Sequence, residues 1–305
     1  MSLRRFAARS VNLGENVAIY EIVPNLSEGR DIATIDAAVA AAESTGSRVL
    51  HRTSDPVHHR SVLTIAGQAK QVLDAAVALA GVVADHIDLR SHRGVHPRIG
   101  ALDVLPFVPL DGGTMAEAVD LAYRAGERIW ERFGIPSFYY GEAARRPDRA
   151  LLASVRSGEF EGLDARFQDP DWAPDTGNVA KHERAGAIAI GARPILIAFN
   201  VELATGDLSV ARAIARNLRE RGGGLQTLRA LGLPLSEDLV QVSLNVTDYR
   251  ATPLHRIVEL IRELAARHGV AVATSELIGC LPRAAVETAA RYYLGTGETV
   301  PLTAE

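Results

Sequence analysis

The feature that most constrains the fold is an order of secondary structure that occurs twice along the chain. Runs of apolar residues and helical spacings predict the order β-α-β-β-α-β in the first half and again in the second, without obvious sequence identity between them. This order forms a split-βαβ unit with helices on one face of a sheet. We therefore predict an α/β protein of the α+β type: two ferredoxin-like split-βαβ subdomains with facing mixed sheets and outer helices. A groove between facing sheets is a usual place for a ligand.

Caps, glycines and prolines set the expected boundaries. In the first half we expect strands at 17–23, 47–53, 60–67, 101–109 and 135–140, and helices at 31–44, 68–85 and 114–133. In the second half we expect two strands within 187–203, further strands at 225–231, 239–247 and 270–274, and helices at 207–222, at 253–268 and from Pro282 onward.

The length of the chain favours two subdomains. The chain has 305 residues, which is long for one compact core. Pro194 separates the two apolar runs within 187–203, so we expect an N-terminal subdomain at 1–194 and a C-terminal subdomain at 195–305.

The connection 141–186 lies between the two repeats of the pattern. A connection of this length is usually functional or flexible. It carries Trp172 between acidic residues and prolines, and exposing such a large aromatic side chain to water is costly. We therefore expect this segment to be ordered against the groove.

Composition and charge exclude several classes of protein. The net charge is −4, whereas a broad nucleic-acid footprint needs a basic surface, so we expect no nucleic-acid partner. No run of 18 apolar residues occurs, so we expect no membrane span, and the N-terminal segment lacks the apolar core of a signal peptide. Cys280 is the single cysteine, which excludes an internal disulfide framework and a cysteine zinc cluster. We expect a cytoplasmic protein.

The basic residues are 31 arginines and only two lysines, Lys70 and Lys181. Genomic base composition is the simpler explanation of this excess. Arginine also binds carboxylates through two parallel hydrogen bonds, as an enzyme for small acidic substrates requires.

Histidines gather around two expected loops of the first half: His58, His59, His92 and His96. The spacing of His92 and His96 suits two metal ligands on a helix, but Gly94 and Pro97 disfavour a helix there, so we expect no metal site. A histidine on a stiffened loop can act as a general acid and base near neutral pH, which makes His96 a candidate. The alternative is a surface histidine without a partner, and the spacing alone favours that alternative.

Two polar residues beside expected strands are further candidates. Asn25 follows the first strand and could donate a hydrogen bond to a substrate oxygen, although the same segment has the composition of a turn that starts a helix. Arg60 begins an otherwise apolar strand, so it needs an acidic partner from the protein or from a ligand. No glycine-rich phosphate-binding motif is present.

These same segments resemble the glutamate formimidoyltransferase (formiminotransferase) family. The similarity extends from about residue 19 to about residue 293. It rests on VPNLSEGRD at 23–31, SDPVHHRSVLTIAG at 54–67, HRGVHPRIGALDVLPFVPL at 92–110, FYYGEAA at 138–144, RSGEFEGL at 156–163, DWAPDTG at 171–177, LIAFNVEL at 196–203, NVTDY at 245–249 and SELIGCLP at 275–282.

The resemblance implies two α/β subdomains whose sheets face each other across a tunnel. It implies transfer of the formimino group from N-formimidoyl-L-glutamate to tetrahydrofolate in histidine breakdown, with His96 of the HPR motif as the catalytic residue. The family commonly has an aromatic residue followed by Gly-Pro after DWAPD, whereas this chain has Thr176 there, followed by glycine and asparagine. The folate-binding loop implied by the resemblance comprises Gly177, Asn178, Val179, Ala180, Lys181, His182, Glu183, Arg184, Ala185 and Gly186.

The chemistry requires one group that takes a proton from folate N5 and returns it to the departing glutamate nitrogen, and one histidine can do both. Both substrates are acidic, so Arg60 and Arg98 are candidate carboxylate ligands, and no metal is needed. Three alternatives stay open: a formyltransferase that uses N-formylglutamate, a metal-dependent hydrolase of formimidoylglutamate, and a non-catalytic sensor. Family resemblance and base rates favour a homodimer. The chain ends where animal relatives continue into a cyclodeaminase domain, so we expect that activity to be absent.

Overall fold

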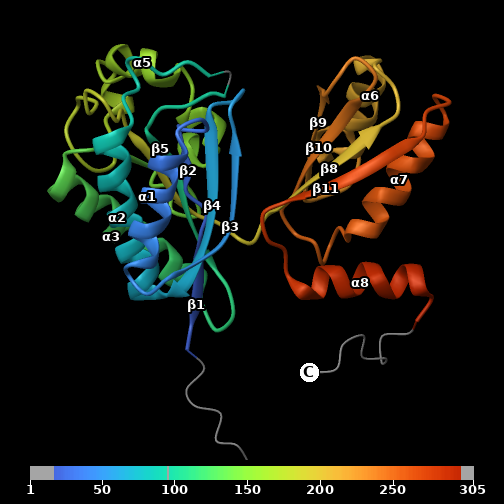
Figure 1. Cartoon of the computed structure of the whole chain (residues 1–305), viewed down its shortest axis with the longest axis horizontal. Helices are drawn as coiled ribbons and strands as arrows, with labels where there is room; N and C mark the ends of the chain where they lie inside the picture. Colours follow the sequence, from blue (N-terminus) through green and yellow to red (C-terminus); the bar gives the residue numbers. More distant parts are fainter. Residues whose placement is uncertain (1–16, 95, 297–305) are drawn as a thin grey trace, which may run out of the picture.

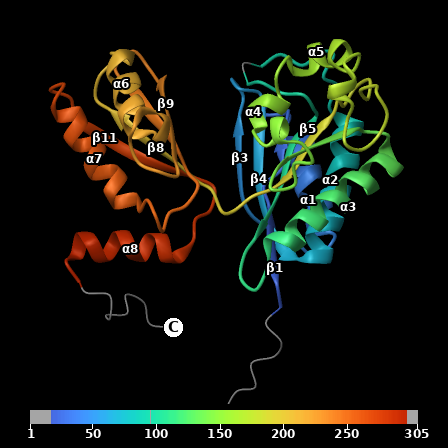
Figure 2. The ribbon, with the colours of Figure 1, turned by 180° about the vertical axis from the view of Figure 1, so that it is seen from behind.

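The computed structural model describes residues 17–94 and 96–296 (Figure 1). Two sheets, each with helices on one face, form two halves joined by one short connection (Figures 1 and 2). Among these residues no helix combines the length and the apolar character that a membrane span requires. The N-terminal segment 1–16, on which the expectation about a signal peptide depends, lies outside the described residues.

The first sheet is mixed and has seven strands. Its strands are β1 (Ile19–Ile22), β2 (Asn25–Leu26), β3 (Arg48–Asp55), β4 (Arg60–Gln68), β5 (Leu102–Pro109), β6 (Ser137–Gly141) and β7 (Ile188–Ala192). Strands β3, β4, β1 and β5 pair in that order and antiparallel, which is the ferredoxin-like arrangement, and β2 also pairs with β4 and β5. Strand β7 runs parallel to both β5 and β6 and extends the sheet.

Helices α1 (Ile32–Glu43), α2 (Ala69–His86) and α3 (Met115–Phe133) cover one face of this sheet (Figure 2). Local sequence sets their ends. Asp31 caps α1 by accepting a hydrogen bond from the backbone of Ala33, and Thr114 and Glu117 form a capping box at the start of α3. Gly134 ends α3 in the left-handed conformation, which glycine adopts without strain.

The second sheet has the order β11-β8-β10-β9 and is antiparallel throughout. Its strands are β8 (Ile197–Leu203), β9 (Leu228–Pro234), β10 (Val240–Val246) and β11 (Val272–Ile278), with helices α6 (Leu208–Leu218), α7 (Leu254–Ala266) and α8 (Arg283–Leu294). The expectation of a mixed sheet was wrong for this half, because each split-βαβ unit places an antiparallel strand between its two parallel ones. The first half becomes mixed only through the added strand β7.

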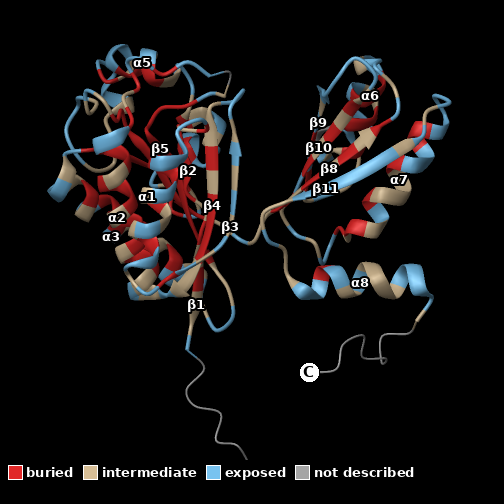
Figure 3. Cartoon of the chain, in the orientation of Figure 1, coloured by how far each residue is buried: buried red, intermediate tan, exposed pale blue. Residues whose placement is uncertain are grey.

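The two halves have separate hydrophobic cores, and the helix-free faces of their sheets turn toward each other (Figures 1 and 3). The halves come close where β11 ends, since a Cβ atom at Gly279 would lie 3.6 Å from Oγ1 of Thr64 on β4. The proposed boundary between residues 194 and 195 falls on the connection from β7 to β8.

The connection 141–186 is ordered and contains more structure than the sequence predicts. It holds two short 3₁₀ turns (Pro147–Arg149 and Pro170–Trp172) and the helices α4 (Leu152–Val155) and α5 (Glu159–Arg166). Trp172 packs on Phe138 of β6, with ring centroids 6.4 Å apart, and joins the first core.

Arg149 holds this connection to the sheet. Its side chain is 2% exposed, forms a 2.9 Å ion pair with Asp175, and donates hydrogen bonds to the carbonyls of Asp171 and Ala173. The guanidinium also lies over the rings of Phe138 and Trp172. Because the pair is buried, removing one partner leaves an uncompensated charge.

We therefore predict that Arg149→Met lowers the free energy of unfolding by about 3–5 kcal/mol, measured by urea denaturation. Arg146 is the matched control, since it also pairs with carboxylates but is exposed to solvent. Arg146→Met should leave the denaturation midpoint nearly unchanged. Equal effects of the two substitutions would contradict this account.

Candidate active site

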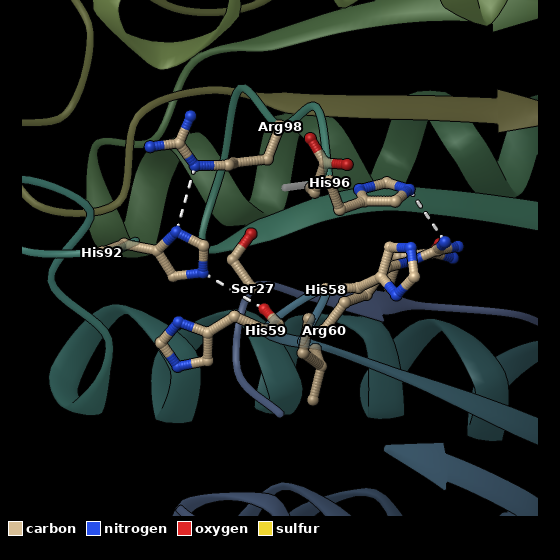
Figure 4. Close-up of a pocket in the computed structure, with 10 residues that line it drawn as sticks. Ser27, His58, His59, Arg60, His92, His96 and Arg98 are labelled. Carbon is tan, nitrogen blue, oxygen red and sulfur yellow. Dashed lines mark hydrogen bonds between the residues drawn. The ribbon is translucent and has the colours of Figure 1, made fainter. Parts of the chain in front are cut away.

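The candidate site lies on the first half, where the turn after β1, the β3–β4 hairpin and the loop before β5 meet. A narrow pocket there, too small to admit a water molecule, brings together the candidate histidines with Asn25, Arg60 and Arg98, but no residue of 177–186 (Figure 4). It is lined by Asn25, Leu26, Ser27, His58, His59, Arg60, His92, His96, Arg98 and Asp103.

Close backbone packing lets these segments meet. A Cβ atom at Gly29 would lie 2.2 Å from the carbonyl oxygen of Asp55 and 2.6 Å from the amide nitrogen of Arg60. Only glycine therefore lets the turn after Asn25 lie directly on the β3–β4 hairpin. Short strand β2 adds to this arrangement by pairing Asn25 with Val62 of β4.

His96 is in contact with Arg60. Nη1 of Arg60 lies 2.8 Å from Nε2 of His96, and Nη2 of Arg60 donates to Oδ1 of Asn25 (Figure 4). Burial, followed by the charges of Arg60 and Arg156, lowers the pKa of His96 to about 3. His96 is therefore partly buried, partnered and uncharged at neutral pH, and the alternative of an unpartnered surface histidine is wrong.

Arg60 is a partly buried cation that no carboxylate contacts directly among the described residues. No ion pair joins it to an acidic side chain among the described residues, and its Nε atom is buried without a hydrogen-bond partner. Burial and the nearby charge of Arg156 lower the pKa of Arg60 to about 10. The sequence predicted that this residue needs an acidic partner. The fold supplies histidine and amide groups by direct contact, and the carboxylates of Asp103 and Asp55 act on its charge only from further away.

Arg98 occupies a different environment. Its guanidinium is 8% exposed and binds Glu161 at 2.7 Å and Glu159 at 3.0 Å, and its Nε donates to Nδ1 of His92 at 3.1 Å. The ring of His92 stacks on that of His59, with centroids 4.2 Å apart, and Nε2 of His92 donates to the backbone carbonyl of His59. Protein groups thus engage all three nitrogens of Arg98, which connects the two histidine loops to α5.

The expected folate-binding loop divides into two parts. Gly177 packs against Trp130 and Pro136, whereas 182–186 forms a tight turn, with mutual backbone hydrogen bonds between His182 and Gly186. Between these parts, Lys181 pairs with Asp164 at 2.8 Å and lies over the ring of Phe160.

Lys181 also lines a second, wider cavity of about 1110 Å³ beside the narrow pocket. The two share His92 and Arg98, and the wide cavity adds Arg30, Arg90 and Arg93. An acidic ligand that enters here would meet a mostly basic wall.

Two residues of the site were not identified from the sequence. Asp103, 2% exposed, accepts hydrogen bonds from the amide of Ile99 and from Arg156. The signal for Asp103 was an acid within the otherwise apolar run 101–109, whereas nothing local marked Arg156.

In the part of the chain that the structure describes, no three or more histidine, cysteine, aspartate or glutamate side chains are placed to hold a metal ion. The expectation that no metal is needed stays a prediction.

Burial makes stability depend on pH. It lowers the pKa values of His92, His96 and His182 below the usual value for histidine, which is about 6.5. In the unfolded chain these histidines take up protons as the pH falls below that value, while in the folded protein they do so only at lower pH. We predict that the free energy of unfolding decreases as the pH falls from 7 to 5. Urea denaturation of the parent and of His96→Gln at several pH values checks this. The variant should lose less stability, and identical pH profiles would contradict the assignment for His96.

Comparison with known proteins agrees with the resemblance. Residues 19–193 match the model of the formiminotransferase domain, N-terminal subdomain, and residues 198–304 match that of the formiminotransferase domain. Glutamate formimidoyltransferases of Streptococcus pyogenes serotype M1 and Thermoplasma acidophilum are each 42% identical, and the alignments cover 90% and 91% of this chain and 93% of each relative. Formimidoyltransferase-cyclodeaminase of Rattus norvegicus is 38% identical over 90% of this chain and 52% of its own length. The chain belongs to the formiminotransferase family.

Proposed function

We propose that the protein is a glutamate formimidoyltransferase, which transfers the formimino group of N-formimidoyl-L-glutamate to tetrahydrofolate and releases L-glutamate and 5-formimidoyltetrahydrofolate. The observation that carries this proposal is the 42% identity to two proteins of that name over nearly their whole length. The uncharged His96 in a pocket with Arg60 supports the same chemistry.

His96 is proposed as the group that moves the proton. As N5 of tetrahydrofolate bonds to the amidine carbon, its proton passes to Nε2 of His96. When the bond from that carbon to the glutamate nitrogen breaks, the same proton returns to the departing nitrogen. The reaction is balanced without metal or redox chemistry, and the positioning of two bound substrates supplies much of the rate.

The remaining assignments concern binding. Segment 177–186 is proposed to bind tetrahydrofolate, supported by Lys181 on the wall of the wide cavity. Asn25 and Arg60 are proposed to contact the donor. Arg98 is proposed for the same role, and its ion pairs with Glu159 and Glu161 also hold the loops together. We further propose a cytoplasmic homodimer that acts in histidine breakdown, in keeping with the single cysteine and the frequency of twofold assemblies.

The proposed function predicts that purified protein releases glutamate from N-formimidoyl-L-glutamate only when tetrahydrofolate is present. His96→Ala should lower kcat by about 10²–10⁴-fold, because it removes the proton carrier. His86→Ala, at the end of α2 and outside both cavities, is the matched control and should retain parental turnover.

Three results would change the conclusion. Glutamate release without folate, restored by zinc after chelation, would favour the hydrolase. Faster turnover of N-formyl-L-glutamate would favour the formyltransferase. Near-parental turnover by a stably folded His96→Ala would remove the proposed mechanism.

The two lysines of the chain test the folate site. Lys181→Met should raise KM for tetrahydrofolate by roughly 5–30-fold, because a cation on the wall of the cavity is lost. Lys70→Met is the control, since Lys70 is 88% exposed on α2 and pairs with Asp74.

Hydrogen exchange of the backbone amides in 177–186 should slow when folate binds. Unchanged exchange there, with protection elsewhere, would contradict the assignment of the loop.

A further inference from the structure

The contact between Arg60 and His96 occupies the atom that the reaction needs. A guanidinium has only donors, so the 2.8 Å contact means that Nη1 of Arg60 donates to the lone pair of Nε2 of His96. In the proposed reaction this lone pair accepts the proton of N5. The pocket is also too narrow for water. In this arrangement His96 cannot act as a base.

Arg60 is poised to leave that contact for an anion. Its other partner is the neutral amide of Asn25, and its Nε has no partner. A partly desolvated guanidinium that no carboxylate contacts is costly, so a donor carboxylate that takes the place of the His96 ring on Arg60, and thereby opens the pocket, gains a charge-assisted hydrogen bond. Arg98 and Arg156, by contrast, already hold Glu161 and Asp103.

We propose that Arg60 couples donor binding to catalysis: the α-carboxylate of N-formimidoyl-L-glutamate draws the Arg60 guanidinium off His96 and thereby frees Nε2 to accept the N5 proton. This inference rests on the proposed function. Arg60 acts as a positioning residue that keeps the base masked until the donor is bound.

The chemistry of the donor identifies the carboxylate. The formimino group is attached to the nitrogen on the α-carbon, and that nitrogen must come within hydrogen-bonding distance of His96 to receive the proton. The α-carboxylate is attached to the same carbon. It therefore arrives beside the group that now touches Nε2, whereas the side-chain carboxylate lies further along the molecule.

The charges around His96 favour the same outcome as the geometry, because a carboxylate on Arg60 makes the imidazole a better proton acceptor. The titratable and charged groups that face His96 are Arg60 on β4, Arg156 after α4 and His58 in the β3–β4 turn, and Asp103 on β5 already pairs with Arg156. After burial, the charge of Arg60 is the largest influence that disfavours protonation of the imidazole, and a carboxylate bound to Arg60 weakens it. His96 then gains proton affinity and becomes a more effective base near neutral pH.

The test follows the imidazole of His96 by ¹⁵N NMR between pH 5 and 8 in the full chain. The His96→Gln spectrum assigns the signals. Free protein should show His96 uncharged across this range. Saturating L-glutamate should raise the pKa of His96, seen as the onset of protonation at the acidic end of the range, because the charge of Arg60 no longer opposes protonation while burial still does. γ-Aminobutyrate, which is glutamate without the α-carboxylate, should cause no such change. No response to L-glutamate, or equal responses to both, would overturn the proposal.

Two arginine variants provide the second measurement. In Arg60→Met, the onset of His96 protonation should appear at the acidic end of this range without ligand, and kcat/KM for the donor should fall by roughly 10–100-fold. The control is Arg52→Met, since Arg52 is an exposed arginine on β3 that pairs with Asp36. This variant should leave both the pKa of His96 and kcat/KM unchanged. If Arg60→Met keeps His96 uncharged across this range, Arg60 does not mask the base. Parental turnover with tetrahydrofolate, combined with an NMR spectrum that does not respond to glutamate, would overturn this inference alone. Absence of turnover in the parent would instead remove the proposed function.

Discussion

The cost of burying positive charge organises the first half of this protein. Arg149 is paired with Asp175, Arg156 with Asp103, and Arg98 with Glu159 and Glu161, and each pair joins segments that lie far apart in the sequence. A buried guanidinium without such a partner costs several kcal/mol, so these pairs fix where the loops can lie. Arg60 departs from this arrangement, and its position beside His96 gives the site its electrostatic character.

The sheet provides the rigid base on which these charges are arranged. Strand β2, only two residues long, lies between β4 and β5 and holds Asn25 opposite Val62 and Val104. This pairing places the turn after β1 against the β3–β4 hairpin, so that a neutral amide reaches Arg60. The helices on the opposite face bury the apolar side of the same strands, which leaves the helix-free face for polar groups.

Much of the fold followed from local pattern. The order of the longer strands and helices and the caps of α1 and α3 reflect short-range preferences of the backbone. The antiparallel character of the second sheet was missed, because pairing direction depends on which strand lies between two others. The helices within 141–186 were missed as well, since they are short and their apolar faces become apparent only against Phe138 and the core.

The sequence by itself determined the type of elements, the family and the residue types available for chemistry, since periodicity, caps and long motifs are contained in contiguous segments. Only the tertiary structure decided what those residues do together. Arg60 and His96 are separated by 36 positions, and Arg98 and Glu161 by 63, so no local pattern could indicate that one arginine is neutralised by carboxylates while the other rests on the histidine. The physical reason is that burial and partnership set the state of an ionisable group, and both arise only when distant segments pack together.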